Sequence, residues 1–120
     1  MIRVLIEWHC LPDKEAEMDG LLVELRTGAM RQRGYIFGET MRSADDPSLW
    51  LVISTWLDLD MWRAWETSPA RQAIVGRIVP LRLTPPKVSA FGFVWETNWW
   101  PQDTGHYAMD EPPVHPAKDL

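Results

Sequence analysis

Residues 2–10 read IRVLIEWHC, a segment in which a fully apolar set of side chains alternates with a mixed set. Successive side chains of a β-strand point to opposite faces, so the alternation predicts a first strand with two different faces. The apolar face carries Ile2, Val4, Ile6, Trp8 and Cys10. The mixed face carries Arg3, Leu5, Glu7 and His9. Because the apolar face has to be covered, the strand belongs in a packed sheet.

A helix is predicted between this strand and Gly34. Pro12 and Asp13 end the strand, and the Asp13 side chain can accept a hydrogen bond from the first helical turn. Apolar residues then keep the spacing of one buried helical stripe, at Met18, Leu21, Leu22, Leu25 and Ala29. Arg31 and Arg33 before Gly34 are typical of a basic, glycine-capped helix end.

The rest of the chain predicts a hairpin, a broken helix and a last strand. Residues 35–43 and 49–56 are rich in β-branched and apolar side chains and flank a polar turn, so they predict paired strands. Asp58 or Asp60 can cap a second helix, which Ser68 and the proline after it should split. Prolines then end helical structure before a strand over residues 87–95.

The resulting order, βαββαβ, predicts an α+β, ferredoxin-like subunit with an antiparallel sheet and two helices on one face. The opposite sheet face needs a cover, and we assign Ile2, Val4, Ile6 and Trp8 to it. Eight Trp in 120 residues are also more than a small monomer core readily accommodates. We therefore expect a homodimer that covers this face.

Composition narrows the class of protein. Apolar residues make up 46% and charged residues 24%, which is a globular balance. Residues 1–95 hold 11 basic and 12 acidic groups with no basic stripe, so neither nucleic acid nor an anionic membrane is an expected partner. A single cysteine, Cys10, and an apolar start too short for a signal core indicate a cytoplasmic protein.

Residues 96–120 differ from the domain over residues 1–95. They hold five acidic residues, four prolines and the pair Trp99 and Trp100. This composition predicts an extended acidic tail rather than a further regular element. Its tryptophans should dock it on a subunit, either as a lid over a pocket or as an interface arm.

The sequence lacks the usual signatures of cofactor sites. Neither GxGxxG, a phosphate-binding P-loop nor GxSxG occurs, and no histidine has a ligand partner at helical spacing. We therefore expect neither a metal nor a nucleotide cofactor. Glu7 and His9, about 7 Å apart on one strand face, are the candidate acid or base groups. The competing interpretation is that this face is merely solvated.

Several residues are candidates for binding a flat ligand. Trp62 and Trp65 lie one helical turn apart and could close one side of a cavity, although both also fit an ordinary core. Tyr35 is a further candidate for substrate contact. Arg63 could pair with an anionic substrate group, with a surface salt bridge as the competing interpretation.

Residues 56–69, WLDLDMWRAWETSP, resemble the antibiotic biosynthesis monooxygenase family, whose members form dimeric α+β barrels. The resemblance extends over residues 1 to about 95 through the strand and proline that open the chain, the glycine before Tyr35 and the PPKV entry to the last strand. It implies two ferredoxin-like subunits with facing sheets.

The resemblance also implies chemistry. Some members oxygenate aromatic polyketides or quinols with O₂ and no metal or flavin, and others degrade haem. The haem-degrading branch uses a strand-one asparagine, a tryptophan and a haem-ligating histidine ten residues after it. Trp65 matches that tryptophan, but Glu7 and Val75 stand in the other two places. We therefore expect a protein isolated without haem or flavin.

Two functions follow as hypotheses. The first is a cofactor-independent monooxygenase acting on a polycyclic phenol or quinol held between the sheet and the second helix. Trp65 would position the ring, and His9 or Glu7 would take the phenolic proton. The second is a non-catalytic dimeric module that binds a hydrophobic small molecule. A sealed pocket into which Glu7 or His9 points favours the enzyme, and an exposed pair favours the module.

Overall fold

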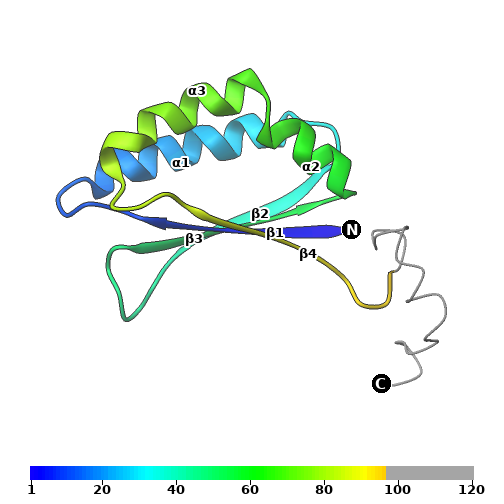
Figure 1. The fold of residues 1–120 in the computed structure, drawn as a ribbon, viewed down its shortest axis with the longest axis horizontal. Coiled ribbons are helices and arrows are strands. Elements are labelled where there is room, and N and C mark those ends of the chain that lie inside the picture. The colour runs from blue at the N-terminus through cyan, green and yellow to red at the C-terminus, as the bar shows by residue number, and fades with distance from the viewer. Residues whose placement is uncertain (97–120) are drawn as a thin grey trace.

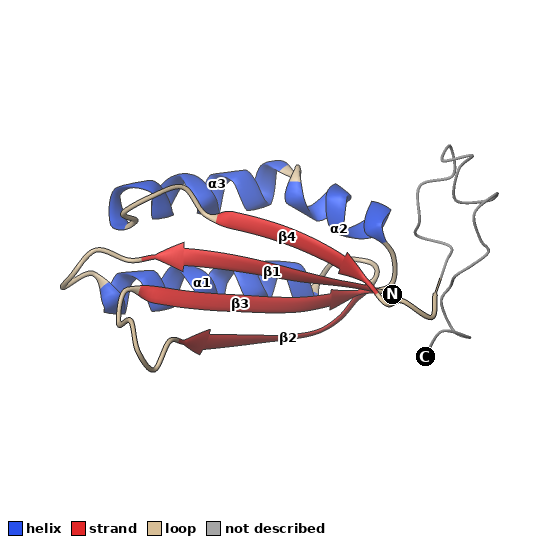
Figure 2. Cartoon of the chain, turned by 60° about the horizontal axis from the view of Figure 1, so that its bottom comes forward, coloured by secondary structure: helices blue, strands red, loops and turns tan. Residues whose placement is uncertain are grey.

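A layer of helices lies on one face of a four-stranded antiparallel sheet in the computed structural model, which describes residues 1–96 (Figure 1). The elements in chain order are β1 (Ile2–His9), α1 (Glu15–Met30), β2 (Tyr35–Arg42), β3 (Leu49–Trp56), α2 (Leu59–Glu66), α3 (Pro69–Ile78), a 3₁₀ turn (Val79–Leu81) and β4 (Lys87–Gly92). The strand order is β2-β3-β1-β4 (Figure 2). The predicted α+β, ferredoxin-like fold is confirmed. The predicted docking of the tail concerns residues outside the described part of the chain.

Helix starts follow local capping with one exception. The Asp58 carboxylate accepts a hydrogen bond from the Met61 amide at 2.9 Å, and the Ser68 hydroxyl accepts one from the Arg71 amide at 3.2 Å. The predicted break before Pro69 is therefore real. Asp13 does not cap α1: its φ of 66° places it in the turn before the helix. The last strand ends at Gly92, three residues earlier than predicted.

The assignment of the apolar face of β1 was wrong. Ile2, Val4, Ile6 and Trp8 lie under the helices, where they form one buried core with α1 residues such as Met18 and with Ile78 of α3. The helices need a fully apolar surface to pack on, and this row is the more apolar of the two faces of β1. Glu7 and His9 consequently lie on the face turned away from the helices.

The single chain buries more tryptophan than the sequence argument allowed. Five indoles are at most 8% exposed: Trp8, Trp50, Trp56, Trp62 and Trp65. They come from β1, β3 and α2, so they meet between the sheet and the helices. Trp95, by contrast, is 66% exposed and stacks on Phe93 with ring centroids 4.7 Å apart. Tryptophan content alone therefore does not require a dimer.

The sheet face away from the helices still carries large apolar side chains, and we call it the open face. Its strand pairs include Phe37 with Thr55, Leu5 with Ile53 and Arg3 with Phe91. Phe37, Met41 and Phe91 are each about half exposed. Within residues 1–96, none of the helices has the length and hydropathy needed to cross a membrane.

Candidate functional site

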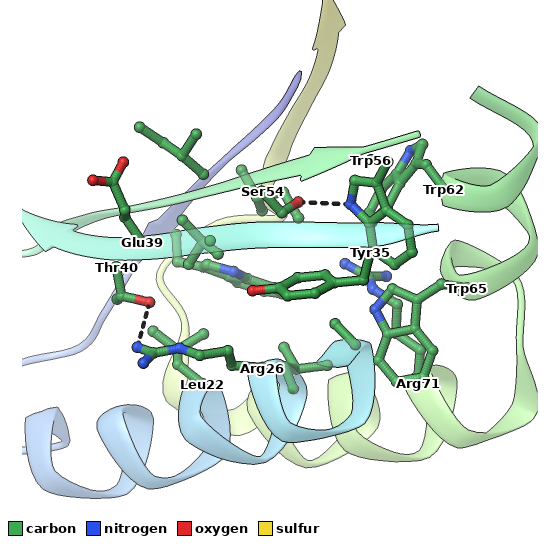
Figure 3. A pocket seen from close by; sticks show the side chains of 17 residues that line it. Leu22, Arg26, Tyr35, Glu39, Thr40, Ser54, Trp56, Trp62, Trp65 and Arg71 are labelled. Atoms are coloured by element: carbon green, nitrogen blue, oxygen red, sulfur yellow. Dashed lines mark hydrogen bonds between the residues drawn. The ribbon is translucent and has the colours of Figure 1, made fainter. Parts of the chain in front are cut away.

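A cavity lies between the sheet and α1, beside α2 (Figure 3). The space open to the centre of a water-sized sphere is about 40 Å³. The aromatic residues of its wall are Trp8, Tyr35, Trp56, Trp62 and Trp65. One water needs about 10–15 Å³ by this measure, so the cavity as it stands has room for about three waters and must widen to admit even one aromatic ring. A polycyclic substrate would require the helices to move apart.

The aromatic wall is fixed by ring contacts and by α2. The Trp56 ring lies between Tyr35, at 5.4 Å in an edge-on contact, and Trp62, at 5.7 Å. The Trp56 indole N–H donates to Ser54 at 2.9 Å. Trp62 and Trp65 are on the buried side of α2, as their spacing of three residues predicts. The structure therefore brings Tyr35, Trp62 and Trp65 together at one cavity.

The position of the Tyr35 ring depends on Gly38, which lies three residues later in the same strand, β2. A β-carbon on Gly38 would lie 2.6 Å from the Tyr35 hydroxyl oxygen, so a larger residue there would displace the phenol from this position. Burial raises the pKa of Tyr35, and the positive charge of Arg26 partly opposes that effect. The phenol is therefore a neutral hydrogen-bond donor at ordinary pH.

Arg71 of α3 reaches the same cavity and was missed by the sequence analysis. Its side chain is buried, with 7% exposed, and its guanidinium carbon lies 5.3 Å from the centre of the Trp62 ring. Burial lowers the pKa of Arg71, and the charge of Glu66 partly opposes this. Its position was available as a signal, because Arg71 precedes Val75 and Ile78 at the spacing of a buried helical stripe.

Glu7 and His9 are not at this cavity. They share one face of β1 as predicted, but that face is the open face. The Glu7 carboxylate lies 4.0 Å from the Lys87 ammonium group, and the His9 ring lies 3.4 Å from the Ser48 hydroxyl. The sheet therefore separates both from Trp65, and one subunit does not assemble the acid–base group suggested by the sequence.

The remaining candidate, Arg63, is on the solvent side of α2. Its side chain is 53% exposed and pairs with Glu66 at 3.0 Å. The surface salt bridge is thus the interpretation that the structure supports for Arg63. Glu39 lines the edge of the cavity, but its carboxylate points away from the helices (Figure 3).

No group of three or more His, Cys, Asp or Glu side chains in residues 1–96 is placed to hold a metal ion. Val75, ten residues after Trp65, is partly buried against the apolar core. The cavity chemistry rests instead on aromatic rings, the Tyr35 hydroxyl and the Arg71 guanidinium. These groups can hold a flat ligand and donate hydrogen bonds to it.

The sequence profile of antibiotic biosynthesis monooxygenases matches residues 1–77 of the 120-residue chain. The chain belongs to the antibiotic biosynthesis monooxygenase family. The family resemblance found in the sequence is therefore confirmed. A comparison with curated proteins gives no match.

Solved structures from this family share the fold at low identity. A candidate antibiotic biosynthesis monooxygenase from Nitrosomonas europaea has a TM-score of 0.71 and 15% identity, over 78% of this chain and 99% of that one. One from Bordetella bronchiseptica has a TM-score of 0.70 and 21% identity, over 78% and 96%. SnoaB, a cofactor-independent oxygenase from Streptomyces nogalater, has a TM-score of 0.67 and 16% identity, over 77% and 92%. At these identities the likeness establishes the fold.

Proposed function

We propose that this family member is a monooxygenase that oxidises an aromatic phenol or quinol with O₂ and needs no metal or flavin. The observation that carries the proposal is the cavity walled by Tyr35, Trp62 and Trp65, because stacked and edge-on aromatic contacts suit a flat electron-rich ring. Membership of the family and the fold shared with SnoaB, described as a cofactor-independent oxygenase, support the reaction type.

The reaction proposed for a phenol balances without an added reductant. The ring carbon para to the hydroxyl exchanges its hydrogen for one oxygen atom and becomes a carbonyl, so the phenol becomes a quinone. The second oxygen atom leaves as water with the two hydrogens that the phenol loses. All four electrons that reduce O₂ come from the substrate. Trp65 would position the ring, as the family resemblance implies.

The mechanism requires an acceptor for the phenolic proton. Glu7 and His9 were the proposed acceptors, but in one subunit they lie across the sheet from the cavity. We therefore propose substrates that ionise readily, with the phenolic proton passing to solvent as the ligand enters.

A non-catalytic module that binds an aromatic molecule is the second candidate. The observation that favours it is the absence, among residues 1–96, of a carboxylate or imidazole inside the cavity. The proposed ligand is the same in both cases. The two functions differ only in whether O₂ is consumed.

Oxygen uptake with a series of one-, two- and three-ring phenols that carry a hydrogen para to the hydroxyl separates the two functions. Chelator-treated protein should speed O₂ consumption, and ¹⁸O₂ should deliver one labelled atom to the quinone. Trp65→Phe should slow the reaction, whereas Trp95→Phe, a change outside the cavity, should not. Phenol binding without any acceleration of O₂ uptake over heat-denatured protein would leave the binding module as the function.

We further propose that the protein acts as a homodimer joined through the open face. Half-exposed Phe37, Met41 and Phe91 give this face the apolar character that an interface core needs. The family resemblance implies the same arrangement of facing sheets.

A further inference from the structure

Arg71 is a buried positive charge with neither a carboxylate partner nor a side-chain hydrogen bond in residues 1–96. Its side chain is 93% buried, since 7% is exposed. No described carboxylate forms an ion pair with its guanidinium, and none of its side-chain N–H groups has a described hydrogen-bond acceptor. The negative charge of Glu66 acts on the pKa of Arg71, but the Glu66 carboxylate already pairs with Arg63 at 3.0 Å.

Burying an unpaired charge lowers the stability of the folded protein. An arginine stays protonated at any ordinary pH, so it cannot shed its charge when it is buried. The Trp62 ring, 5.3 Å from the guanidinium carbon, supplies a cation–π contact but accepts no conventional hydrogen bond. Buried charges are normally paired, so the missing partner points to an anion that enters from outside.

The other polar groups of the cavity wall also offer hydrogen-bond donors more than acceptors. The indole N–H groups of Trp8 and Trp62 are buried and have no acceptor. The hydroxyl oxygens of Thr40 and Ser54 already accept hydrogen bonds, from Arg26 and Trp56 respectively. Arg26, which is exposed at the edge of the cavity, adds a second positive charge beside Tyr35 (Figure 3). The cavity therefore complements a ligand that brings acceptors and negative charge.

We propose that the cavity binds a single-ring aromatic carboxylate, with the carboxylate paired to Arg71 and the ring held against Trp62 and Trp65. The planar guanidinium presents two parallel N–H donors, a geometry that a carboxylate matches. The free space of about 40 Å³ is small, so the cavity must widen as the ligand enters, and this requirement favours a single ring over a larger one. This inference deepens the proposed function, because it names the anionic group that the substrate or ligand carries.

Calorimetric titration of the full-length protein at pH 7 under nitrogen tests binding apart from turnover. Benzoate is the probe, and benzamide is its neutral counterpart of nearly the same shape. Benzoate should bind at least about tenfold more tightly, because a hydrogen bond to a charged group is worth more than one to a neutral group. Equal affinity for the two, or no benzoate binding, would overturn the proposal.

Arg71→Met removes the charge and keeps much of the side-chain volume. It should abolish the preference for benzoate over benzamide, while Arg71→Lys should keep part of it. The melting temperature of Arg71→Met should stay level or rise, because an unpaired buried charge is replaced by an apolar group. A retained preference in Arg71→Met would contradict the role of Arg71.

Arg77→Met is the matched control on the same helix. Arg77 forms an exposed two-bond ion pair with Glu24, so its loss changes the net charge equally without touching the cavity. It should keep the preference for benzoate. A protein that prefers benzoate through Arg71 yet never consumes O₂ with phenolic acids would refute the oxygenase and leave the carboxylate site intact.

Discussion

The Trp65 ring occupies the space that a side chain on Gly28 would need: a β-carbon there would lie 2.6 Å from Cη2 of the indole. Gly28 of α1 therefore leaves the space in which the Trp65 ring of α2 packs against the helix. Gly28→Ala should displace the indole or separate the helices. Overpacking costs about 1–3 kcal/mol, more than the gain of up to about 1 kcal/mol from the better helix former. Urea unfolding should show a net loss of stability.

Gly20→Ala is the matched control in the same helix. A β-carbon at Gly20 meets no atom within 4 Å, so only the helix propensity changes. The free energy of unfolding should rise by up to about 1 kcal/mol. If both substitutions stabilise the protein equally, the proposed packing of Trp65 on Gly28 is incorrect.

Ser68 links two residues of the cavity wall. Its hydroxyl donates to the Trp65 carbonyl at 2.8 Å and accepts from the Arg71 amide at 3.2 Å. Ser68→Ala should lower the free energy of unfolding by about 1 kcal/mol through loss of the helix cap. Ser68→Asp keeps an acceptor for the amide and should recover most of that loss. An alanine variant as stable as the native protein would mean that the cap contributes nothing.

Local signals in the sequence predicted the elements well, because each depends on residues close together in the chain. Asp58 and Ser68 begin α2 and α3 where their side chains meet the first-turn amides. The faces of β1 could not be assigned that way. The sequence shows which row is fully apolar, but whether the helices or a second subunit cover that row depends on tertiary packing, in which it forms the core with α1.

The site was predictable only in part for a related reason. Trp62 and Trp65 share a helix face, so their spacing places them together. Because the apolar face of β1 packs under the helices, Glu7 and His9 lie on the opposite face of the sheet from Trp65. Arg71 was missed because a charged residue on a helix is normally solvent-exposed, and its burial depends on contacts with another element, the Trp62 ring of α2.

The free energy of unfolding should fall in alkaline solution because of the buried Tyr35 phenol. Burial, its largest cause, raises the pKa of this phenol above the ordinary value of 10.0. Below pH 10 both the folded and unfolded states keep the proton, so the contribution is fully present. As the pH rises through the folded pKa, the unfolded state holds fewer protons and the contribution is lost. Urea unfolding at several pH values measures the effect.

The comparison with Tyr35→Phe isolates this phenol from Tyr107 and the other groups that titrate above pH 9. The difference in unfolding free energy between the native protein and Tyr35→Phe should be constant up to about pH 10. Above that pH the native protein should lose stability relative to Tyr35→Phe. A difference that stays constant to the highest pH at which both fold would show that Tyr35 is not buried in the folded state.

Phe37 should contribute to self-association through the open face. Its side chain is 51% exposed and its strand partner is Thr55, whose row also holds Arg3 and Phe91. Aromatic residues dominate the energetics of interface cores, so Phe37→Lys should weaken dimerisation at least about tenfold. Light scattering across a concentration series measures the shift toward the mass of one chain.

Val23→Lys is the control for Phe37→Lys, because Val23 is 48% exposed on α1, in the layer of helices on the other side of the sheet. Both variants add one positive charge in place of a half-exposed apolar side chain, so they differ mainly in the face that they alter. A dimer should survive Val23→Lys and dissociate in Phe37→Lys, with the circular dichroism of both unchanged. A native protein that is monomeric at micromolar concentration, or a dimer lost only in Val23→Lys, would move the interface away from the sheet.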